Sequence, residues 1–261
     1  MPQPLSHRAK LCVLGAGAWG TALAIQAARA GNAVALWARD PARAAAIAEA
    51  RENARHLPGA RISAAVTVTG DLEAATQGAL LAIVAVPAQH MRAVLERLPP
   101  GAAALPLVIG AKGVEQGTLK LPLEVAAEAR PEAPGAVLSG PNFAHEVAAG
   151  LPAAAVVASR DAALRERVGD LLGSPGFRLY GGDDPMGVQV GGAAKNVIAI
   201  AAVSCRPPSA TVRRASSARP RVTSAARAFS PRPAPMTAPA AMAMTFFAAP
   251  PTCTPIGSSP P

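Results

Sequence analysis

The sequence predicts an α/β fold built on a doubly wound, mostly parallel sheet. Uncharged runs of strand length, such as residues 80–86, alternate with helical patterns as far as residue 183. These runs are apolar throughout, as expected for parallel strands that are buried on both faces. A glycine-rich turn at residues 15–20 joins the first apolar run to the first helical pattern. Together these observations favour alternating βα units around one sheet.

The glycine turn reads G-x-G-x-x-G, with Gly15, Gly17 and Gly20 at its three fixed positions. Gly15 allows a tight turn from strand to helix, Gly17 lets a pyrophosphate approach the backbone, and Gly20 lets the helix pack close to the strand. The free N–H groups and the positive end of the helix then face the phosphates. The pattern alone is a weak signal, because a simple glycine turn would read the same way.

The residues on either side of this turn favour dinucleotide binding. Residues 11–14 suit a buried strand, residues 21–29 suit a helix with Gly31 at its C-terminal cap, and residues 33–37 suit a second strand. The resulting βαβ unit has about the ~30 residues that the motif requires. The sequence therefore predicts a Rossmann-type domain for NADP(H) or NAD(H).

The later elements follow in chain order. Asp40 as N-cap and Pro41 at the first position predict a helix over residues 41–51, and Asp71 opens a brief helix. The further strands are predicted at residues 65–69, 80–86, 105–109, 136–139, 153–159 and 177–180. The further helices are predicted at residues 89–98, at 119–129 with Thr118 as cap, after Asn142 through Ala148, and at 161–172.

A last helix is predicted to begin at Asp184 and Pro185 and to run over residues 186–202. It contains Gly187, Gly191 and Gly192, each of which weakens a helix by about 1 kcal/mol relative to Ala. Such glycines indicate that another surface comes very close. Close helix packing and a wall of an active site would both require this, and the sequence leaves the two readings open.

We expect three parts in the chain. Residues 1–183 form the dinucleotide-binding Rossmann domain, residues 184–202 the first helix of a truncated all-α substrate domain, and residues 203–261 a tail. The tail holds 12 of the 27 prolines and no Leu, so we expect it to be disordered or ordered only in fragments. We hypothesise that it is an out-of-frame translation of a GC-rich coding sequence, which resequencing of the gene would test.

The composition excludes some functions. The 261 residues, 51% of them hydrophobic, suffice for one large or two smaller domains. The net charge of +9 depends on the tail, where seven Arg and no acidic residue lie, because the other 202 residues carry a net charge of only +2. With 3% aromatic residues there are few platforms for stacking bases. We therefore expect no nucleic-acid partner.

Cysteine usage and hydropathy predict a cytoplasmic protein. Cys12, Cys205 and Cys253 form neither a metal-binding nor a redox spacing, which fits a reducing compartment. Basic residues before the uncharged residues 11–28 loosely mimic a signal peptide, but glycines and polar residues interrupt that stretch. No other stretch is apolar enough to predict a membrane span.

The end of the second predicted strand carries Arg39 and Asp40, about twenty residues beyond the glycine turn. An acidic residue there would hold a ribose 2′-hydroxyl, whereas an Arg would accommodate a 2′-phosphate. Asp40 is already assigned as a helix cap, so we lean towards NADP(H). A solvated surface charge is the other reading of Arg39.

Lysine is rare, with four Lys beside 21 Arg. Lys112 follows a predicted strand, at the edge where open α/β sheets bind ligands. Lys195 lies in the glycine-marked helix among small or apolar residues. The ammonium group of a lysine can donate a proton, and burial can tune its pKa. A lone lysine on a helix, however, more often extends to solvent. His56, His90 and His145 have no partner at a telling spacing, and no nucleophile elbow, zinc spacing or P-loop occurs.

Several segments together resemble the bacterial-type NAD(P)-dependent glycerol-3-phosphate dehydrogenases. The resemblance covers about residues 8–202, and its most specific segment is the long run at residues 187–200, G-V-Q-V-G-G-A-A-K-N-V-I-A-I. The other matching segments are residues 15–24, 36–41, 86–87, 111–113 and 139–144.

The resemblance implies reversible hydride transfer between NAD(P)H and dihydroxyacetone phosphate, which gives sn-glycerol 3-phosphate for phospholipid synthesis. Lys195 matches the catalytic lysine, which donates a proton to the carbonyl oxygen. Lys112 matches a lysine that contacts cofactor and substrate, and Gly140 and Asn142 match substrate-side positions, although Thr or Ser is usual in place of Asn142. The implied cofactor contacts are Gly15, Ala16, Gly17, Ala18, Trp19, Gly20, Arg39, Lys112 and Ala144, with no metal.

Beyond Ala202 the sequence departs from the family, which continues into a helical domain that supplies an Arg–Asn pair for the substrate phosphate. Each lost charge-assisted contact would remove about 1.5–3 kcal/mol of binding energy. We therefore weigh a dehydrogenase with reduced or absent activity against a non-catalytic dinucleotide-binding module from a truncated or frameshifted gene. A β-hydroxyacid dehydrogenase or ketopantoate-type reductase is a third reading, since these share the cofactor fold. The family is often homodimeric, a state that the sequence of this chain does not fix.

Overall fold

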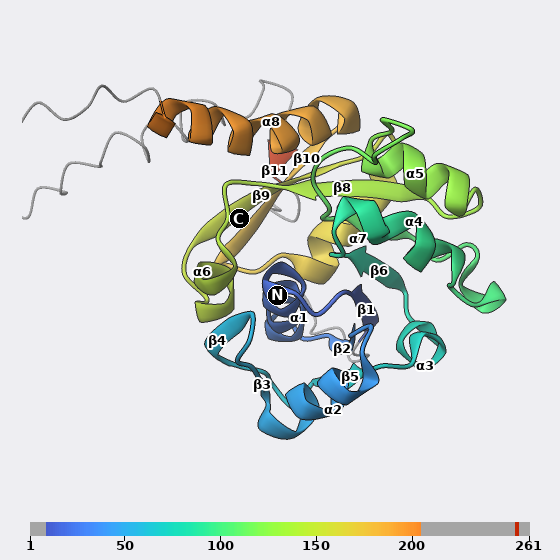
Figure 1. Cartoon of the computed structure of the whole chain (residues 1–261), viewed down its shortest axis with the longest axis vertical. Coiled ribbons are helices and arrows are strands. Elements are labelled where there is room, and N and C mark those ends of the chain that lie inside the picture. Colours follow the sequence, from blue (N-terminus) through green and yellow to red (C-terminus); the bar gives the residue numbers. More distant parts are fainter. Residues whose placement is uncertain (1–8, 205–253, 256–261) are drawn as a thin grey trace, which may run out of the picture. The chain divides into compact units, whose positions relative to one another are not determined.

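The computed structural model describes residues 9–204 and 254–255 (Figure 1). The chain divides into two units, residues 1–194 with 249–261, and residues 195–248. The predicted character of residues 203–261 falls almost entirely outside the described residues, and the predicted three-part division stays a prediction. In the described part of the tail, β11 (Thr254–Pro255) pairs antiparallel with β10 (Phe177–Gly182).

The first unit is built on one sheet, and its strand order is β11-β10-β9-β8-β7-β6-β1-β2-β5. Strands β5, β2, β1, β6, β7 and β8 are parallel and lie in the classic doubly wound order, which confirms the predicted fold class. Their bounds are β1 Lys10–Leu14, β2 Ala33–Trp37, β5 Val66–Thr69, β6 Leu81–Val84, β7 Leu107–Ile109 and β8 Gly135–Ser139.

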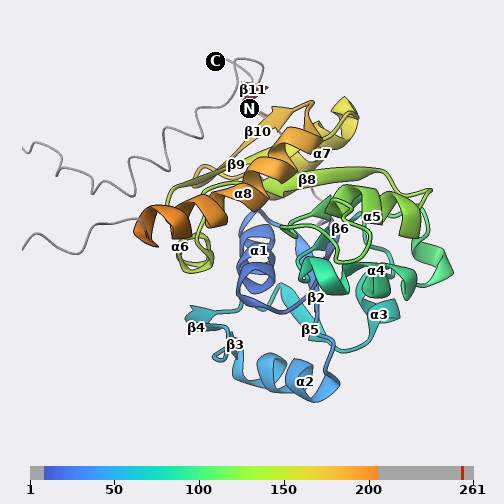
Figure 2. The same cartoon turned by 45° about the horizontal axis from the view of Figure 1, so that its top comes forward.

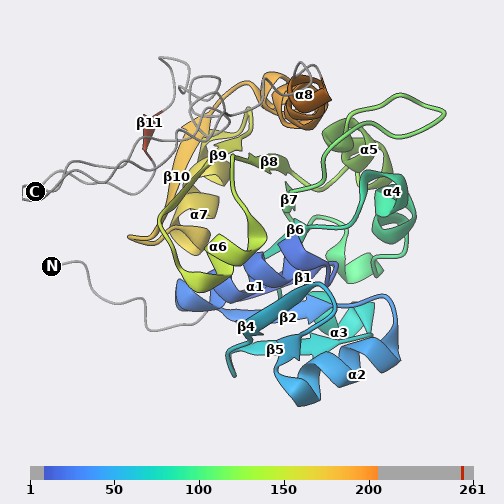
Figure 3. The same ribbon diagram turned by 60° about the vertical axis from the view of Figure 1, so that its left-hand side comes forward.

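Helices cover both faces of this sheet, because successive strand residues point to opposite sides. Leu11 and Val13 of β1 belong to one hydrophobic core, while Cys12 and Leu14 belong to the other. The first core takes side chains from α1 (Ala18–Arg29), α6 (Ala144–Ala149) and α7 (Ala162–Leu172). The second takes them from α3 (Leu72–Thr76), α4 (Ala88–Glu96) and α5 (Pro122–Ala129), and Figure 3 shows α4 and α5 opposite α6 and α7.

Aspartate side chains cap the starts of four helices in the described ranges, and three of these starts, at Asp40, Asp71 and Asp184, were predicted. Asp40 accepts a hydrogen bond from the backbone N–H of Ala42 at 3.0 Å and starts α2 (Pro41–Ala50). Asp71 caps α3, and Asp161 caps α7. Each carboxylate satisfies N–H groups that the helix itself leaves without an acceptor.

One predicted helix start is wrong. We predicted a helix over residues 119–129 with Thr118 as its cap, but α5 begins at Pro122. Leu119 has a φ of +58°, which is not a helical conformation, and the Thr118 hydroxyl donates instead to Glu115 at 2.7 Å. Proline suits the first position of a helix because its missing N–H would have no partner there, and this places the boundary.

Two features of the sheet region go beyond the sequence prediction. A hairpin formed by β3 (Glu52–Asn53) and β4 (Leu57–Arg61) lies beside α1 and α2 (Figure 2). Strand β9 (Ala153–Ala158) runs antiparallel to β8, and β10 is parallel to β9. The sheet is therefore mostly but not wholly parallel. A short 3₁₀ turn, η1 (Pro100–Ala102), follows α4.

The last helix, α8 (Pro185–Ser204), forms close to its predicted bounds. The Asp184 carboxylate accepts a hydrogen bond from the Gly187 N–H at 2.8 Å. A Cβ on Gly192 would lie 2.9 Å from the Ser139 hydroxyl oxygen, so a surface does come very close there, whereas a Cβ on Gly191 would meet no atom within 4 Å. Among the described residues, no helix is long and apolar enough to cross a membrane.

Candidate functional site

The glycine turn lies between β1 and α1, and its three glycines are needed for different reasons. Gly15 has a φ of +112°, a conformation that side chains disfavour, and a Cβ there would lie 2.9 Å from Val86. A Cβ on Gly20 would overlap the carbonyl oxygen of Gly15. A Cβ on Gly17 would meet no atom within 4 Å. The space beside Gly17 is the one that a phosphate group would need.

The N-terminus of α1 has no side-chain cap, a feature that it shares with α4. Gly17 is its N-cap residue and supplies no side-chain hydrogen bond, and no acidic residue lies in the first turn. By contrast, carboxylates cap α2, α3 and α7. The N–H groups at the start of α1 and the positive end of its dipole are thus left for an anionic group, which is what a dinucleotide pyrophosphate would supply.

Cationic side chains gather beyond the end of β2. Arg39 is exposed there, and the carboxylate of Asp40 is occupied by its backbone hydrogen bond in α2. Burial lowers the pKa of Arg43, and the charge of Arg55 lowers it further. Burial, then Arg43 and Arg55, likewise lower the pKa of His56. Such a group of positive charges suits a phosphate better than a ribose hydroxyl.

Two side chains that the sequence analysis did not single out reach the glycine turn, Asn53 from β3 and Arg43 from α2. Asn53 donates from Nδ2 to the Ala16 carbonyl oxygen at 2.9 Å and to the Thr21 hydroxyl oxygen at 2.8 Å. Arg43 also donates to the Ala16 carbonyl oxygen. Asn53 and Ala16 are 37 residues apart in the sequence, and no local pattern links them.

Lys112 is exposed on the loop that follows β7. At the start of this loop, a Cβ on Gly110 would lie 3.2 Å from the indole nitrogen of Trp19, so the loop passes directly against α1. Among the described residues, that buried indole nitrogen has no hydrogen-bond partner. Trp19 and the Lys112 loop are therefore neighbours, and Lys112 follows the carboxyl end of a strand as predicted.

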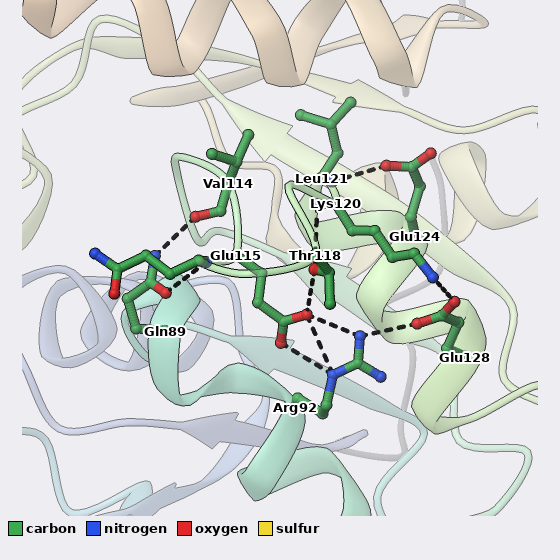
Figure 4. Close-up of polar contacts among 10 residues, drawn as sticks. Gln89, Arg92, Val114, Glu115, Thr118, Lys120, Leu121, Glu124 and Glu128 are labelled. Carbon is green, nitrogen blue, oxygen red and sulfur yellow. Dashed lines mark hydrogen bonds and ion pairs between the residues drawn. The ribbon is translucent and has the colours of Figure 1, made fainter.

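An ionic network anchors the Lys112 loop to α4 and α5 (Figure 4). Arg92 of α4 donates to Glu115 at 2.8 Å and to Glu128 of α5 at 2.8 Å. Gln89 donates to a loop carbonyl at 2.7 Å and accepts from a loop N–H at 2.9 Å. The hydrogen bond from Arg92, followed by that from Thr118, lowers the pKa of Glu115 to about 2. The loop is thus fixed from both sides.

The substrate-side residues follow β8. A small pocket brings Lys112 together with Ser139 and with Gly192 of α8. Close by, a Cβ on Gly140 would lie 2.7 Å from the Asn142 amide nitrogen. Among the described residues, the buried Ser139 hydroxyl and the Asn142 Nδ2 atom lack hydrogen-bond partners. Unpaired buried polar groups are rare in proteins, and these are available to polar atoms of a ligand.

The other predicted residues divide between the units. Ala144 is the first residue of α6, directly after the β8 loop. Lys195 lies in the second unit, so its catalytic role stays a prediction. His56, His90 and His145 are all exposed, and His145 is stacked near Phe143 with a centroid distance of 5.9 Å. No group of three or more candidate metal ligands occurs within the described ranges.

A wider hollow of about 540 Å³ lies away from the glycine turn, beside the C-terminal half of α1. Arg29, Arg51 and Arg61 line it. Arg29 donates to carbonyl oxygens at the end of α6, and Arg51 donates to carbonyl oxygens of the segment before and within β5. These two guanidinium groups are used to hold backbone segments together, so the hollow offers less to a ligand than its charge indicates.

The sequence of the chain matches the model of a known protein family. The model described as NAD-dependent glycerol-3-phosphate dehydrogenase N-terminus matches residues 10–165. The glycerol-3-phosphate dehydrogenase [NAD(P)+] of Azorhizobium caulinodans is 55% identical over 195 residues, which are 74% of this chain and 59% of that protein. The enzyme of the same name from Caulobacter vibrioides is 51% identical over 193 residues, 74% of this chain and 58% of that protein.

The solved structures agree with the sequence comparisons. The crystal structure of glycerol-3-phosphate dehydrogenase from Coxiella burnetii matches with a TM-score of 0.69 and 33% identity, over 74% of this chain and 60% of that one. The chain spans about three fifths of the length of the relatives it matches. The family match covers the glycine turn, the Lys112 loop and the residues after β8. By that match, this chain belongs to the NAD-dependent glycerol-3-phosphate dehydrogenase family, to whose N-terminal part it corresponds.

Proposed function

We propose that this chain binds NAD(P)(H) and serves the reversible interconversion of dihydroxyacetone phosphate and sn-glycerol 3-phosphate. The observation that carries the proposal is the uncapped start of α1 behind an open Gly17, within a chain that belongs to this dehydrogenase family. The unpaired polar groups of Trp19, Ser139 and Asn142 fit the same proposal, since each can donate a hydrogen bond to a ligand.

The proposed contacts to the cofactor come from the glycine turn and from residues around it. The pyrophosphate would lie against residues 15–20, with its charge facing the N–H groups of α1. Arg39 supports NADP(H) over NAD(H), and the positive charges of Arg43 and Arg55 add to that preference. When bound, the dinucleotide supplies or accepts the hydride. Trp19, Lys112 and Ala144 complete the proposed cofactor contacts.

On the substrate side, the proposal must name the group that donates the proton and stabilises the developing negative charge. Reduction of a ketone builds negative charge on its oxygen, and a nearby ammonium group can stabilise this charge and supply the proton. We assign that role to Lys195, on the resemblance of residues 187–200 to the family. Lys112 would hold substrate and cofactor together from its anchored loop, and Gly140 and Asn142 would contact the substrate. Here Asn142 would offer an amide where the family usually has a hydroxyl.

A second candidate function is dinucleotide binding without turnover. The curated relatives that the chain matches are named as dehydrogenases, which favours turnover over this candidate. The glycine turn would then bind the cofactor, and the pocket at Lys112, Ser139 and Gly192 would support no turnover of the substrate. Synthesis of glycerophospholipids is a finer part of our proposal that the resemblance carries, and a cytoplasmic location is a finer part that cysteine usage and hydropathy carry.

The test is NADPH oxidation by the purified chain with dihydroxyacetone phosphate. Turnover that is lost in Lys195→Ala but retained in the control Lys10→Ala supports the enzyme. The control lysine begins β1, at the opposite end of the strand from the glycine turn, and donates to the carbonyl oxygens of Ala74 and Gln77. NADPH binding without turnover supports the second candidate. If neither NADPH nor NADH binds, both candidates fail. A panel of β-hydroxyacids and ketopantoate separates the related reductases.

A further inference from the structure

We propose that Asn53 is a positioning residue, which holds the glycine turn in the orientation that dinucleotide binding requires. The inference rests on the proposed function, because it concerns the same binding loop. Asn53 lies in the β3–β4 hairpin and is 1% exposed. Its single amide nitrogen bridges the loop, at the Ala16 carbonyl, and the first turn of α1, at the Thr21 hydroxyl.

The chemistry fixes how this amide is oriented. A carbonyl oxygen can only accept hydrogen bonds, so the Nδ2 atom of Asn53 must face Ala16. The Oδ1 atom then faces Arg43, which donates to it at 3.4 Å. Both Asn53 and Arg43 donate to the same Ala16 oxygen. That oxygen is thereby held on the hairpin side of the loop by two donors, one of them charged.

The position of this oxygen decides where the next N–H points. Because a peptide unit is planar and trans, the N–H of Gly17 points opposite to the carbonyl of Ala16. With the oxygen held at the hairpin, the Gly17 N–H points away from it. Two donors on one carbonyl also polarise that peptide unit, which makes its N–H a better donor. Rotation of the peptide would instead turn a carbonyl oxygen towards the pyrophosphate.

A matched control exists at the other end of the same helix. Asn32 is also buried, 6% exposed, and its Nδ2 donates to Ala27 at 2.9 Å and to Leu171 at 2.6 Å. Both buried asparagines therefore donate two hydrogen bonds from Nδ2 that hold an end of α1. Only Asn53 touches the glycine turn. A purely structural role predicts the same effects for both, whereas a positioning role predicts different ones.

The experiment compares Asn53→Leu with Asn32→Leu in the full chain, at a temperature where both are folded. NADH is the titrant, because it lacks the 2′-phosphate that Arg43 would contact. We expect the dissociation constant to rise about tenfold in Asn53→Leu, as for the loss of one well-placed hydrogen bond, and to stay within about twofold in Asn32→Leu. If Asn53→Leu does not fold, the milder pair Asn53→Ser and Asn32→Ser gives the same comparison.

Hydrogen exchange of the free protein is the second measurement and needs no bound cofactor. The N–H groups of Gly15 and Thr21 donate to Trp37 and Gly17, both at 3.0 Å, at the two ends of the loop. We expect both amides to exchange faster in Asn53→Leu and to be unchanged in Asn32→Leu. Equal losses of NADH affinity in the two variants, or unaltered exchange in Asn53→Leu, would overturn the proposal. An unaltered chain that binds neither NADH nor NADPH contradicts the proposed function, while the exchange data still decide the role of Asn53.

Discussion

At the scale of single residues, the glycine turn shows how one motif combines two physical requirements. Gly20 is needed for packing, because a Cβ there would overlap the backbone of Gly15. Gly17 is in open space, and its φ of −78° is accessible to any residue. The fold therefore requires glycine at position 20, because a larger side chain has no room there. At position 17 only the binding of a ligand requires glycine.

The first prediction separates these requirements. Gly20→Ala should lower the free energy of unfolding by about 1–3 kcal/mol, the usual cost of overpacking, because the backbone of the turn must move. Gly17→Ala should leave the melting temperature close to that of the unaltered chain but weaken NADPH binding by about tenfold or more, since the methyl group fills the approach path of the pyrophosphate. Thermal melts and NADPH fluorescence titrations measure the two effects. A Gly17→Ala variant with unaltered affinity would mean that the dinucleotide does not pass this residue.

At the scale of elements, the Lys112 loop depends on helices on both sides. Glu115 accepts from Arg92 of α4, and Glu128 of α5 accepts from Arg92 and from Lys120. Exposed ion pairs contribute little, but Glu115 is largely covered, with an 11% exposed side chain. The network therefore matters less for overall stability than for keeping the loop that carries Lys112 in one place.

The second prediction follows from the lowered pKa of Glu115, about 2 against an ordinary value of 4.5. Since the folded-state pKa is the lower one, the stabilising contribution is complete above about pH 4.5 and is lost as the pH falls towards 2. Glu115→Gln should lower the melting temperature at pH 7 and should flatten its decline between these two pH values. The exposed Glu132→Gln variant is the control. A decline as steep as that of the unaltered chain would show that the Arg92–Glu115 contact is absent in solution.

Element boundaries and directions show what local patterns encode. The caps at Asp40 and Asp71 were predicted, because capping involves residues two or three positions apart. The helix start at Pro122 was missed, although proline at a first helical position was a readable signal. The direction of β9 and β10 was not predicted, but the alternation of buried Phe177 with exposed Arg178 in β10 indicates a strand with one solvated face.

At the scale of the whole molecule, Cys12 lies at the centre of the fold. It is 0% exposed, in the strand that pairs with both β2 and β6. Burial raises the pKa of its thiol to about 12, against a smaller opposing effect of Lys10. Because the thiolate is the reactive form, this cysteine should be chemically inert while the sheet is intact. Its reaction with an alkylating reagent therefore reports opening of the sheet.

The third prediction uses Cys12 to detect ligand binding. Alkylation of the peptide that contains Cys12, followed by mass spectrometry, should be slow in native buffer and fast above the unfolding midpoint. NADPH at 100 times its dissociation constant stabilises the native state by about 2.7 kcal/mol, so it should slow alkylation by about 100-fold. Labelling that is equally fast with and without NADPH would show that the native state does not bind it.

The sequence by itself determined the features that depend on near neighbours in the chain. The glycine turn, the helix caps and the uncharged strands all use residues a few positions apart, so their local pattern is enough to predict them. The parallel core of the sheet follows as well, since alternating βα units with a glycine turn have few ways to pack. The position of Lys112 after the carboxyl end of a strand could be inferred from this order alone.

Only the tertiary structure decided which distant side chains support the site. The hydrogen bonds of Asn53 to Ala16 and of Arg92 to Glu115 join residues that are 37 and 23 positions apart. Nothing in either segment reveals its partner, because a polar side chain in a short hairpin or on a helix is equally compatible with solvent. The contacts form when the sheet brings these segments together, and their strength depends on the burial that the sheet creates.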